Sequence, residues 1–364
     1  MEQHVSVSPN SGRQFELDFA KFAAIVFMVL VHCYDYSSLY LSPQLDGSGV
    51  AAATSPWGTL IEFLGAQPAA PVFMFCMGVG LVYTRHGSAG EFARRGVKLL
   101  VTGYLLNLYR TAIVGLGVLS GALGDMAPGG LLAAFALCVD ILPFAGLAFL
   151  FFALLKRLNV SHTWAAAIVL LLLILAQMLP SVGGGERWYC YLAGLLWYQN
   201  DFTSFPLLQW LPFPMAGVIF GTKLKAVQCK RQLYLGALAV GAALFGATTA
   251  VALWRGDDLG TFFTSNYFNM NLLRAAWSLG IVLMLLPAYY FLVGNLGDGK
   301  LRQLATFCSR NINDIYLWQW ILITPIAALA IVLLPIDAYW KLLIEAAFVL
   351  CACILIVNWR KRKA

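Results

Sequence analysis

Residues 232–253 read QLYLGALAVGAALFGATTAVAL, an uncharged run long enough to cross a bilayer as a helix, which takes roughly 20 mostly apolar residues. Residues 163–180, TWAAAIVLLLLILAQMLP, form a second uncharged run. Hydrophobic residues fill 60% of the 364 positions and charged residues only 11%, whereas ordinary globular chains carry roughly 25% charged residues. This composition excludes a soluble enzyme, a disordered chain and a secreted disulfide scaffold. The unbroken runs also disfavour an outer-membrane barrel, whose strands alternate polar and apolar residues.

We therefore predict an all-α polytopic integral membrane protein with about 10–11 transmembrane helices around a polar central cavity. A tail (residues 1–16) precedes the transmembrane domain (residues 17–358), and a basic tail (residues 359–364) follows it. Residues 187–199 are too short to cross and are predicted to form an interfacial or re-entrant helix. The expected spans are 17–38, 57–84, 93–118, 130–155, 162–181, 205–224, 232–254, 271–294, 311–334 and 338–358.

The distribution of Lys and Arg predicts the orientation of these spans. Of the 24 basic residues, 18 fall on the side that holds both chain ends, five fall on the other side, and Lys21 lies within the first span. Because cytoplasmic loops carry the excess of Lys and Arg, both termini are predicted to be cytoplasmic. The net charge of +7 is explained in this way, and no nucleic-acid partner is expected. The four histidines are scattered and the eight cysteines form no CxxC pair, so no metal site is expected.

The first span carries the densest set of polar groups. Leu17 to His32 reads LDFAKFAAIVFMVLVH, and at 100° per residue Asp18, Lys21, Met28 and His32 share one stripe. Lys21 and His32 are separated by about 16 Å along the helix axis. Ionisable groups within a membrane are functional hypotheses by default, so we expect this stripe to face the bundle interior. The structural alternative is an Asp–Lys pair and a hydrogen-bonded core histidine.

Polar groups and helix breakers elsewhere also indicate a cavity. Asp35 lies three residues after His32, where it can orient the imidazole or simply be solvated at the helix end. Pro68 and Pro71 are predicted to bend or break the second span, and freed backbone groups are tolerated where they line a cavity. Gly78 permits the close approach of a ligand or of a neighbouring helix. Further intramembrane polar groups are Asp140, Arg274 and Glu345.

Several of these stretches resemble one family. The pattern of D-x-x-K, an apolar run and MVLVH over residues 18–32 is similar to the opening helix of membrane acyltransferases. The resemblance is to the bacterial heparan-α-glucosaminide N-acetyltransferase-like group, within the superfamily that includes acyltransferase-3. Further similar elements follow in the same order: APVFMFCMGVGL (70–81), RRGVKLL (94–100), DILPFAGL (140–147), FPLLQW (205–210), and residues 312–319 with Tyr316 inside them.

The chain also departs from the family pattern. Lys21 stands where acyltransferase-3 proteins usually carry Arg, and Phe22 stands where Gly is usual. Gln319 replaces a histidine found in many members. The eukaryotic N-acetyltransferase has Asn at the place matched by His32 and a catalytic histidine further on, but here no histidine lies between Cys33 and Arg85. His32 is therefore the one candidate for the catalytic histidine.

The resemblance implies an acyl-CoA-dependent membrane O- or N-acyltransferase of the bacterial cytoplasmic (inner) membrane. An acyl group, expected to be acetyl, would pass from cytoplasmic acyl-CoA to a sugar or glycan hydroxyl or amine outside. His32 would act as general base or as transient acyl carrier, and both routes stay open. Asp18, Lys21 and Asp35 would organise the site. Acetyl-CoA is the expected co-substrate, no metal is expected, and a homodimer is left open.

The donor would bind at a cytoplasmic basic cluster, since Arg forks suit phosphate. The predicted donor-binding residues are Arg85, Arg94, Arg95 and Lys98, together with Phe75, Gly78 and Tyr316. The alternative for the basic cluster is that it only sets topology. For the whole chain, the alternative is a transporter or flippase for a small amphiphile or lipid-linked sugar, or else a scaffold or sensor. The pattern of the first span does not recur, and this disfavours a repeat-built transporter.

Overall fold

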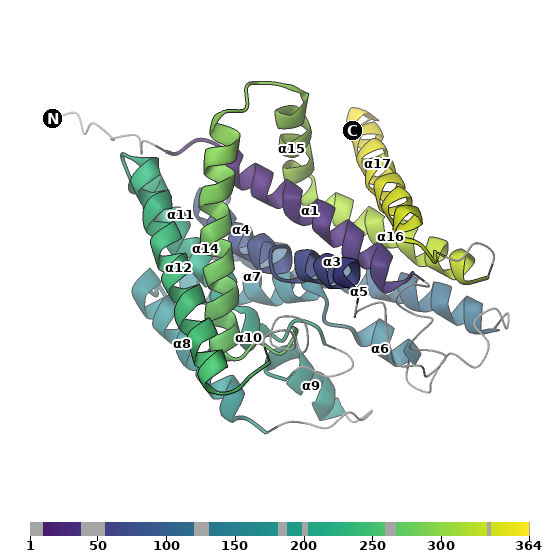
Figure 1. The fold of residues 1–364 in the computed structure, drawn as a ribbon. Coiled ribbons are helices and arrows are strands. Elements are labelled where there is room, and N and C mark those ends of the chain that lie inside the picture. The colour runs from purple at the N-terminus through teal and green to yellow at the C-terminus, as the bar shows by residue number, and fades with distance from the viewer. Residues whose placement is uncertain are drawn as a thin grey trace.

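The computed structural model describes residues 10–37, 55–119, 131–180, 188–198, 203–258, 267–332 and 336–363, and these form an all-α fold (Figure 1). Seven helical segments of this part of the chain are long and apolar enough to cross a membrane. They are α1 (Phe15–Asp35), α3 (Pro56–Ala66) with α4 (Ala70–Tyr83), α5 (Ala89–Leu119), α12 (Lys230–Trp254), α14 (Leu272–Gly294), α16 (Ile312–Val332) and α17 (Tyr339–Lys363). The predicted all-α membrane architecture is confirmed. Residues 1–9 of the predicted N-terminal tail lie outside the described residues.

Three of the ten expected spans are shorter than predicted or broken where no break was predicted, which corrects the expected number of long helices. The span 130–155 is two helices, α6 (Leu131–Leu137) and α7 (Ile141–Arg157). The span 162–181 is α8 (His162–Met178), and 205–224 is α10 (Leu207–Trp210) followed by α11 (Pro212–Ala226). The break before α7 arises because the Asp140 side chain caps that helix, accepting a hydrogen bond from the Ile141 backbone N–H. Pro212 starts α11 because it has no N–H to continue a helix.

The predicted break in the second span is confirmed. α3 ends at Ala66 and α4 begins at Ala70, with Pro68 and Pro71 at the junction. The short segment predicted at 187–199 is a nine-residue helix, α9 (Trp188–Leu196). An eleven-residue helix, α15 (Lys300–Arg310), connects α14 to α16.

Helix α1 is the centre of the molecule. It packs against α3, α4, α14, α15, α16 and α17, and Figure 1 shows it crossing the middle of the fold. Around it, three pairs of helices lie in close contact: α12 with α14, α5 with α7, and α4 with α11. This arrangement surrounds the polar stripe of α1 with other helices, as its sequence predicted.

The contact between α4 and α11 depends on two glycines. A Cβ added at Gly78 would lie 1.9 Å from the Pro214 carbonyl oxygen, and one at Gly217 would lie 2.0 Å from the Phe75 carbonyl oxygen. No larger residue fits at either position without moving a backbone. Small residues at helix interfaces allow such close approach within membranes.

Candidate active site

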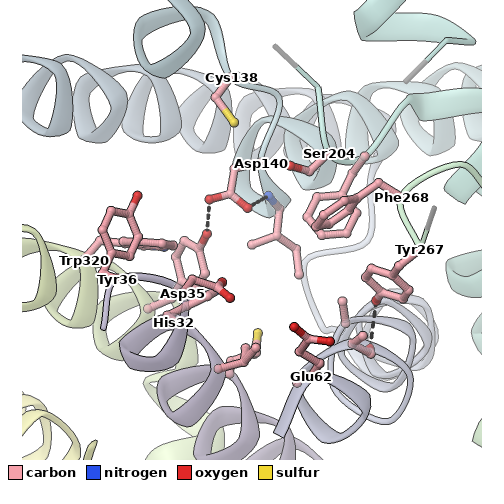
Figure 2. A pocket seen from close by; sticks show the side chains of 18 of the residues that line it. His32, Asp35, Tyr36, Glu62, Cys138, Asp140, Ser204, Tyr267, Phe268 and Trp320 are labelled. Carbon is pink, nitrogen blue, oxygen red and sulfur yellow. Dashed lines mark hydrogen bonds between the residues drawn. The ribbon is translucent and has the colours of Figure 1, made fainter. Parts of the chain in front are cut away.

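A cavity of about 530 Å³ surrounds His32, and we call it the His32 cavity (Figure 2). Its walls come from α1, α3, α4, α5, α7 and α16 and from the segments before α7, α10 and α14. The polar and aromatic side chains that line it include His32, Asp35, Tyr36, Glu62, Arg110, Asp140, Tyr267, Tyr316 and Trp320. The predicted polar central cavity is therefore present.

The His32 ring is held on two sides. Its Nδ1 is 3.1 Å from the amide nitrogen of Gln319, and its centroid is 4.3 Å from that of the Trp320 ring. Asp35 lines the same cavity, but no hydrogen bond joins it to His32 within the described part of the chain. The side chain that orients His32 is therefore Gln319 on α16 rather than Asp35.

A buried ion pair stands beside His32. Arg110 of α5 is 5% exposed, and its Nη1 lies 3.5 Å from Oδ2 of Asp140. Its Nη2 donates a 3.1 Å hydrogen bond to the Tyr36 hydroxyl. Its guanidinium carbon lies 3.9 Å from the centroid of the Trp320 ring, the same ring that packs on His32. The Tyr316 hydroxyl donates a 2.6 Å hydrogen bond to Asp140 Oδ2.

The sequence analysis placed Arg110 only among the five basic residues of the minority side and did not predict its position beside His32. The signal was present, because Arg110 interrupts a long apolar run, LLNLY before it and TAIVG after it. An arginine at such a depth needs an acidic or aromatic partner. Asp140 and Trp320 provide these partners.

A second cavity of about 280 Å³, which we call the basic cavity, lies near the start of α1 and the end of α17. Four basic side chains line it: Lys21, Arg95, Arg310 and Lys361. The Arg95 guanidinium lies 4.7 Å from the Phe149 ring centroid, and Lys361 Nζ lies 3.2 Å from Asp314 Oδ2. The first residues of α16, from Ile312 to Asp314, complete the wall. Basic side chains and a helix N-terminus together favour an anion.

The two cavities are stacked along the same five helices, α1, α4, α5, α7 and α16. On α1, α5 and α16 the residues of the basic cavity come first, and on α4 and α7 those of the His32 cavity come first. That alternation is what helices crossing in opposite directions produce. No described residue lines both cavities. Between the two sets lie buried apolar residues, Ala24 and Ile25 on α1 and Ile315 on α16.

The family model described as an acyltransferase domain, that of acyltransferase-3, matches residues 14–358. The chain belongs to the acyltransferase-3 family. It is therefore a multi-pass membrane acyltransferase, and the matched range includes nearly every residue of the two cavities. No curated protein and no solved structure matches the chain. The similarity to the heparan-α-glucosaminide N-acetyltransferase-like group stays a prediction.

In this acyltransferase, the predicted organisers Asp18 and Lys21 occupy the start of α1. Asp18 is 3% exposed, pairs with Arg13, and accepts a 2.7 Å hydrogen bond from the Ser309 hydroxyl. Lys21 is 3.9 Å from Asp18 and lines the basic cavity. The expected pair exists, but the shorter contacts of Asp18 go to Arg13 and Ser309. Asp18 thus fixes the start of α1, which leaves the Lys21 ammonium at the basic cavity.

The predicted donor residues of the acyltransferase divide among four places. All four basic side chains are exposed, but only Arg95 lines the basic cavity, and Arg85, Arg94 and Lys98 line neither cavity. Tyr316 lines the His32 cavity, 2.6 Å from Asp140.

Phe75 and Gly78 belong to the contact of α4 with α11 and line neither cavity. The Phe75 ring is fully buried and packs on Phe220 with 5.5 Å between the centroids. The assignment of Phe75 and Gly78 to the donor site therefore stays a prediction, and neither residue is included in the candidate site. Arg310 and Lys361, which the sequence did not single out as donor residues, stand at the basic cavity instead.

Proposed function

We propose that this acyltransferase moves an acyl group, acetyl in the first instance, from cytoplasmic acyl-CoA to a sugar or glycan on the other side of the bacterial cytoplasmic membrane. The observation that carries the proposal is the stacking of a basic cavity and a histidine cavity along one set of helices. The excess of Lys and Arg on the side of both termini supports a cytoplasmic position for the basic cavity.

The basic cavity suits the phosphates of CoA. Arginine forks and lysine ammonium groups bind phosphate, and Lys21, Arg95, Arg310 and Lys361 approach this cavity from four helices. The pantetheine arm would then run beside α1 toward His32, over the roughly 16 Å that separate Lys21 from His32. It has to displace the apolar side chains that lie between the cavities. The thioester would end in the His32 cavity.

His32 acts in this proposal as the general base. An acceptor hydroxyl gives its proton to His32 while its oxygen attacks the thioester carbonyl carbon. The negative charge that develops on the carbonyl oxygen is stabilised by Arg110, whose guanidinium packs on the same Trp320 ring as His32. The carbon–sulfur bond then breaks, and His32 returns the proton to the sulfur of CoA.

The Gln319 amide can hydrogen-bond to Nδ1 of His32 in either ring tautomer. When its nitrogen donates to Nδ1, the proton of the neutral ring is on Nε2. A half-turn of the amide presents its oxygen to Nδ1–H and leaves the Nε2 lone pair to accept the acceptor proton. A glutamine can make both hydrogen bonds, which suits a histidine that changes protonation during turnover.

The experiment uses purified protein in detergent with radiolabelled acetyl-CoA, with and without a sugar acceptor mixture. For His32→Ala we expect CoA release to fall about 10²- to 10⁴-fold. For Arg95→Gln we expect a higher KM for acetyl-CoA, whereas Arg94→Gln, one position away and outside the cavity, should match the wild type. Undiminished CoA release from the His32 variant would falsify the assignment.

The covalent route has its own signature in the same experiment. If His32 carries the acyl group, label should accumulate on the wild-type protein when no acceptor is present and not on the His32→Ala variant. Absence of label together with His32-dependent CoA release supports direct transfer.

A further inference from the structure

Two carboxyl groups of the His32 cavity have no partner within the described chain. Asp35, the last residue of α1, and Glu62 of α3 both line this cavity and are partly buried. Neither forms a hydrogen bond or an ion pair with any residue that the structure describes, whereas the third carboxyl, Asp140, pairs with Arg110 and Tyr316. Of the described residues lining the cavity, Arg110 is the one Lys or Arg. The cavity therefore holds more acidic than basic groups.

An aromatic wall faces these carboxyl groups. The Tyr267 hydroxyl donates a 2.8 Å hydrogen bond to the Ala66 carbonyl, which fixes the ring beside α3. Its centroid is 5.0 Å from that of Phe268, which is 5.4 Å from that of Phe205. Figure 2 shows Asp35, Glu62, Tyr267 and Phe268 around one central space, with Asp35 and Tyr267 on opposite sides and Glu62 between them.

Two carboxyl groups beside aromatic rings favour the binding of a cation. Two carboxylates in one partly buried cavity repel each other and are poorly hydrated, and a single cation between them relieves both costs. A neutral hydroxyl can hydrogen-bond to a carboxylate but does not neutralise it. Aromatic faces attract an ammonium group further, through the cation–π interaction.

We infer that the acceptor carries a protonated primary amine as well as a hydroxyl, and that Asp35 and Glu62 bind the ammonium group against the wall of Phe205, Tyr267 and Phe268. This inference rests on the proposed acyl transfer and defines its acceptor as an alcohol that also carries a primary amine, either an amino sugar or a simpler amino alcohol. Asp35 and Glu62 thereby determine specificity, and the chemical step stays with His32.

The same geometry decides which atom is acylated. An ammonium nitrogen held by two carboxylates keeps its proton and has no lone pair to attack the thioester. The hydroxyl oxygen forms the new bond to the acyl carbon, the bond from that carbon to sulfur breaks, and the hydroxyl proton passes through His32 to the sulfur. The product is an ester that retains its free ammonium group.

The test compares three acceptors with the wild-type enzyme and labelled acetyl-CoA: glucosamine, N-acetylglucosamine and ethanolamine. We expect kcat/KM for at least one of the two amines to exceed that for N-acetylglucosamine about 10- to 100-fold, the range for a charge-assisted contact. Hydroxylamine should release the label from the product, because it cleaves esters and leaves amides intact. A higher rate with glucosamine identifies an amino sugar as the acceptor, and a higher rate with ethanolamine identifies an amino alcohol.

Variants complete the test. The Asp35→Asn and Glu62→Gln variants, alone and together, should lose the preference for the amine. Asp257→Asn, which alters a carboxyl paired with Arg255 outside the cavity, should keep it. The comparison of the three acceptors, made with the wild-type enzyme, tests the inference even if the double variant does not fold.

Rates for glucosamine and ethanolamine that both fail to exceed the rate for N-acetylglucosamine, or a label that resists hydroxylamine, overturn the inference while acyl transfer itself stands. A wild-type enzyme that neither binds acetyl-CoA nor releases CoA with any acceptor overturns the proposed function, and the inference with it.

Discussion

The substitution Asp140→Asn tests the buried ion pair beside His32. It keeps the shape of the side chain and an oxygen that can still cap α7, but it removes the negative charge next to Arg110. The side chains of Arg110 and Asp140 are only 7% and 16% exposed, so water can do little to compensate the remaining positive charge. Removing one partner of a buried pair costs about 3–5 kcal/mol, and we expect a loss of this size in the free energy of unfolding.

The opposite change, Arg110→Gln, should cost a similar amount, because it leaves the Asp140 charge uncompensated. The double variant leaves neither charge behind. Its cost should therefore fall below the sum of the two single costs by about 1–3 kcal/mol, the usual coupling between residues in contact. The free energies of unfolding of the wild type, the two single variants and the double variant, measured with denaturant in one detergent, complete this double-mutant cycle.

A matched control is available at the surface. Lys341 Nζ lies 2.5 Å from Asp337 Oδ1, but the two side chains are 35% and 58% exposed. Asp337→Asn should therefore change the unfolding free energy by less than about 1 kcal/mol. Strictly additive costs at Arg110 and Asp140, or a cost at Asp140 no larger than at Asp337, would refute the reasoning.

Three other substitutions test separate parts of the site. Gln319→Ala removes the hydrogen bond to His32 and should lower kcat about tenfold or more with little change in the acetyl-CoA KM; an effect on KM alone in steady-state kinetics would contradict this. Lys361→Gln should raise the acetyl-CoA KM about 3- to 10-fold at low salt and less at high salt, and a salt-independent effect would argue against a phosphate contact. Gly78→Ala should cost about 1–3 kcal/mol through overpacking, whereas Gly80→Ala, with no atom within 4 Å of its added Cβ, should be nearly neutral; thermal unfolding of both variants checks the difference.

The sequence predicted the membrane architecture well because composition and run length report directly on burial in lipid. It also located the break between α3 and α4, since proline acts locally on the helix that contains it. The break between α6 and α7 was missed. There the run of apolar residues continues, and the interruption comes from the Asp140 side chain capping a new helix.

From the sequence, only the part of the candidate site that lies on helix α1 was predicted correctly. The polar stripe of α1 was predicted to face the interior of the bundle, and it does, because Lys21 and His32 each line a cavity. The partner of His32 was not predictable, since Gln319 lies 287 positions away in the chain. The Arg110–Asp140 pair and the approach of Lys361 to Asp314 are likewise tertiary contacts. Residue spacing within one helix carries no information about which distant helix packs against it.

The apolar layer between the two cavities has a consequence for the membrane itself. On α1 and α16, the residues that stand between the linings of the two cavities, Ala24, Ile25 and Ile315, are apolar and buried. In the proposed reaction, the pantetheine arm displaces these side chains and fills the space between the two cavities that it opens. In this proposal an acyl group crosses the membrane, while the apolar residues between the two cavities keep the aqueous phases on the two sides apart.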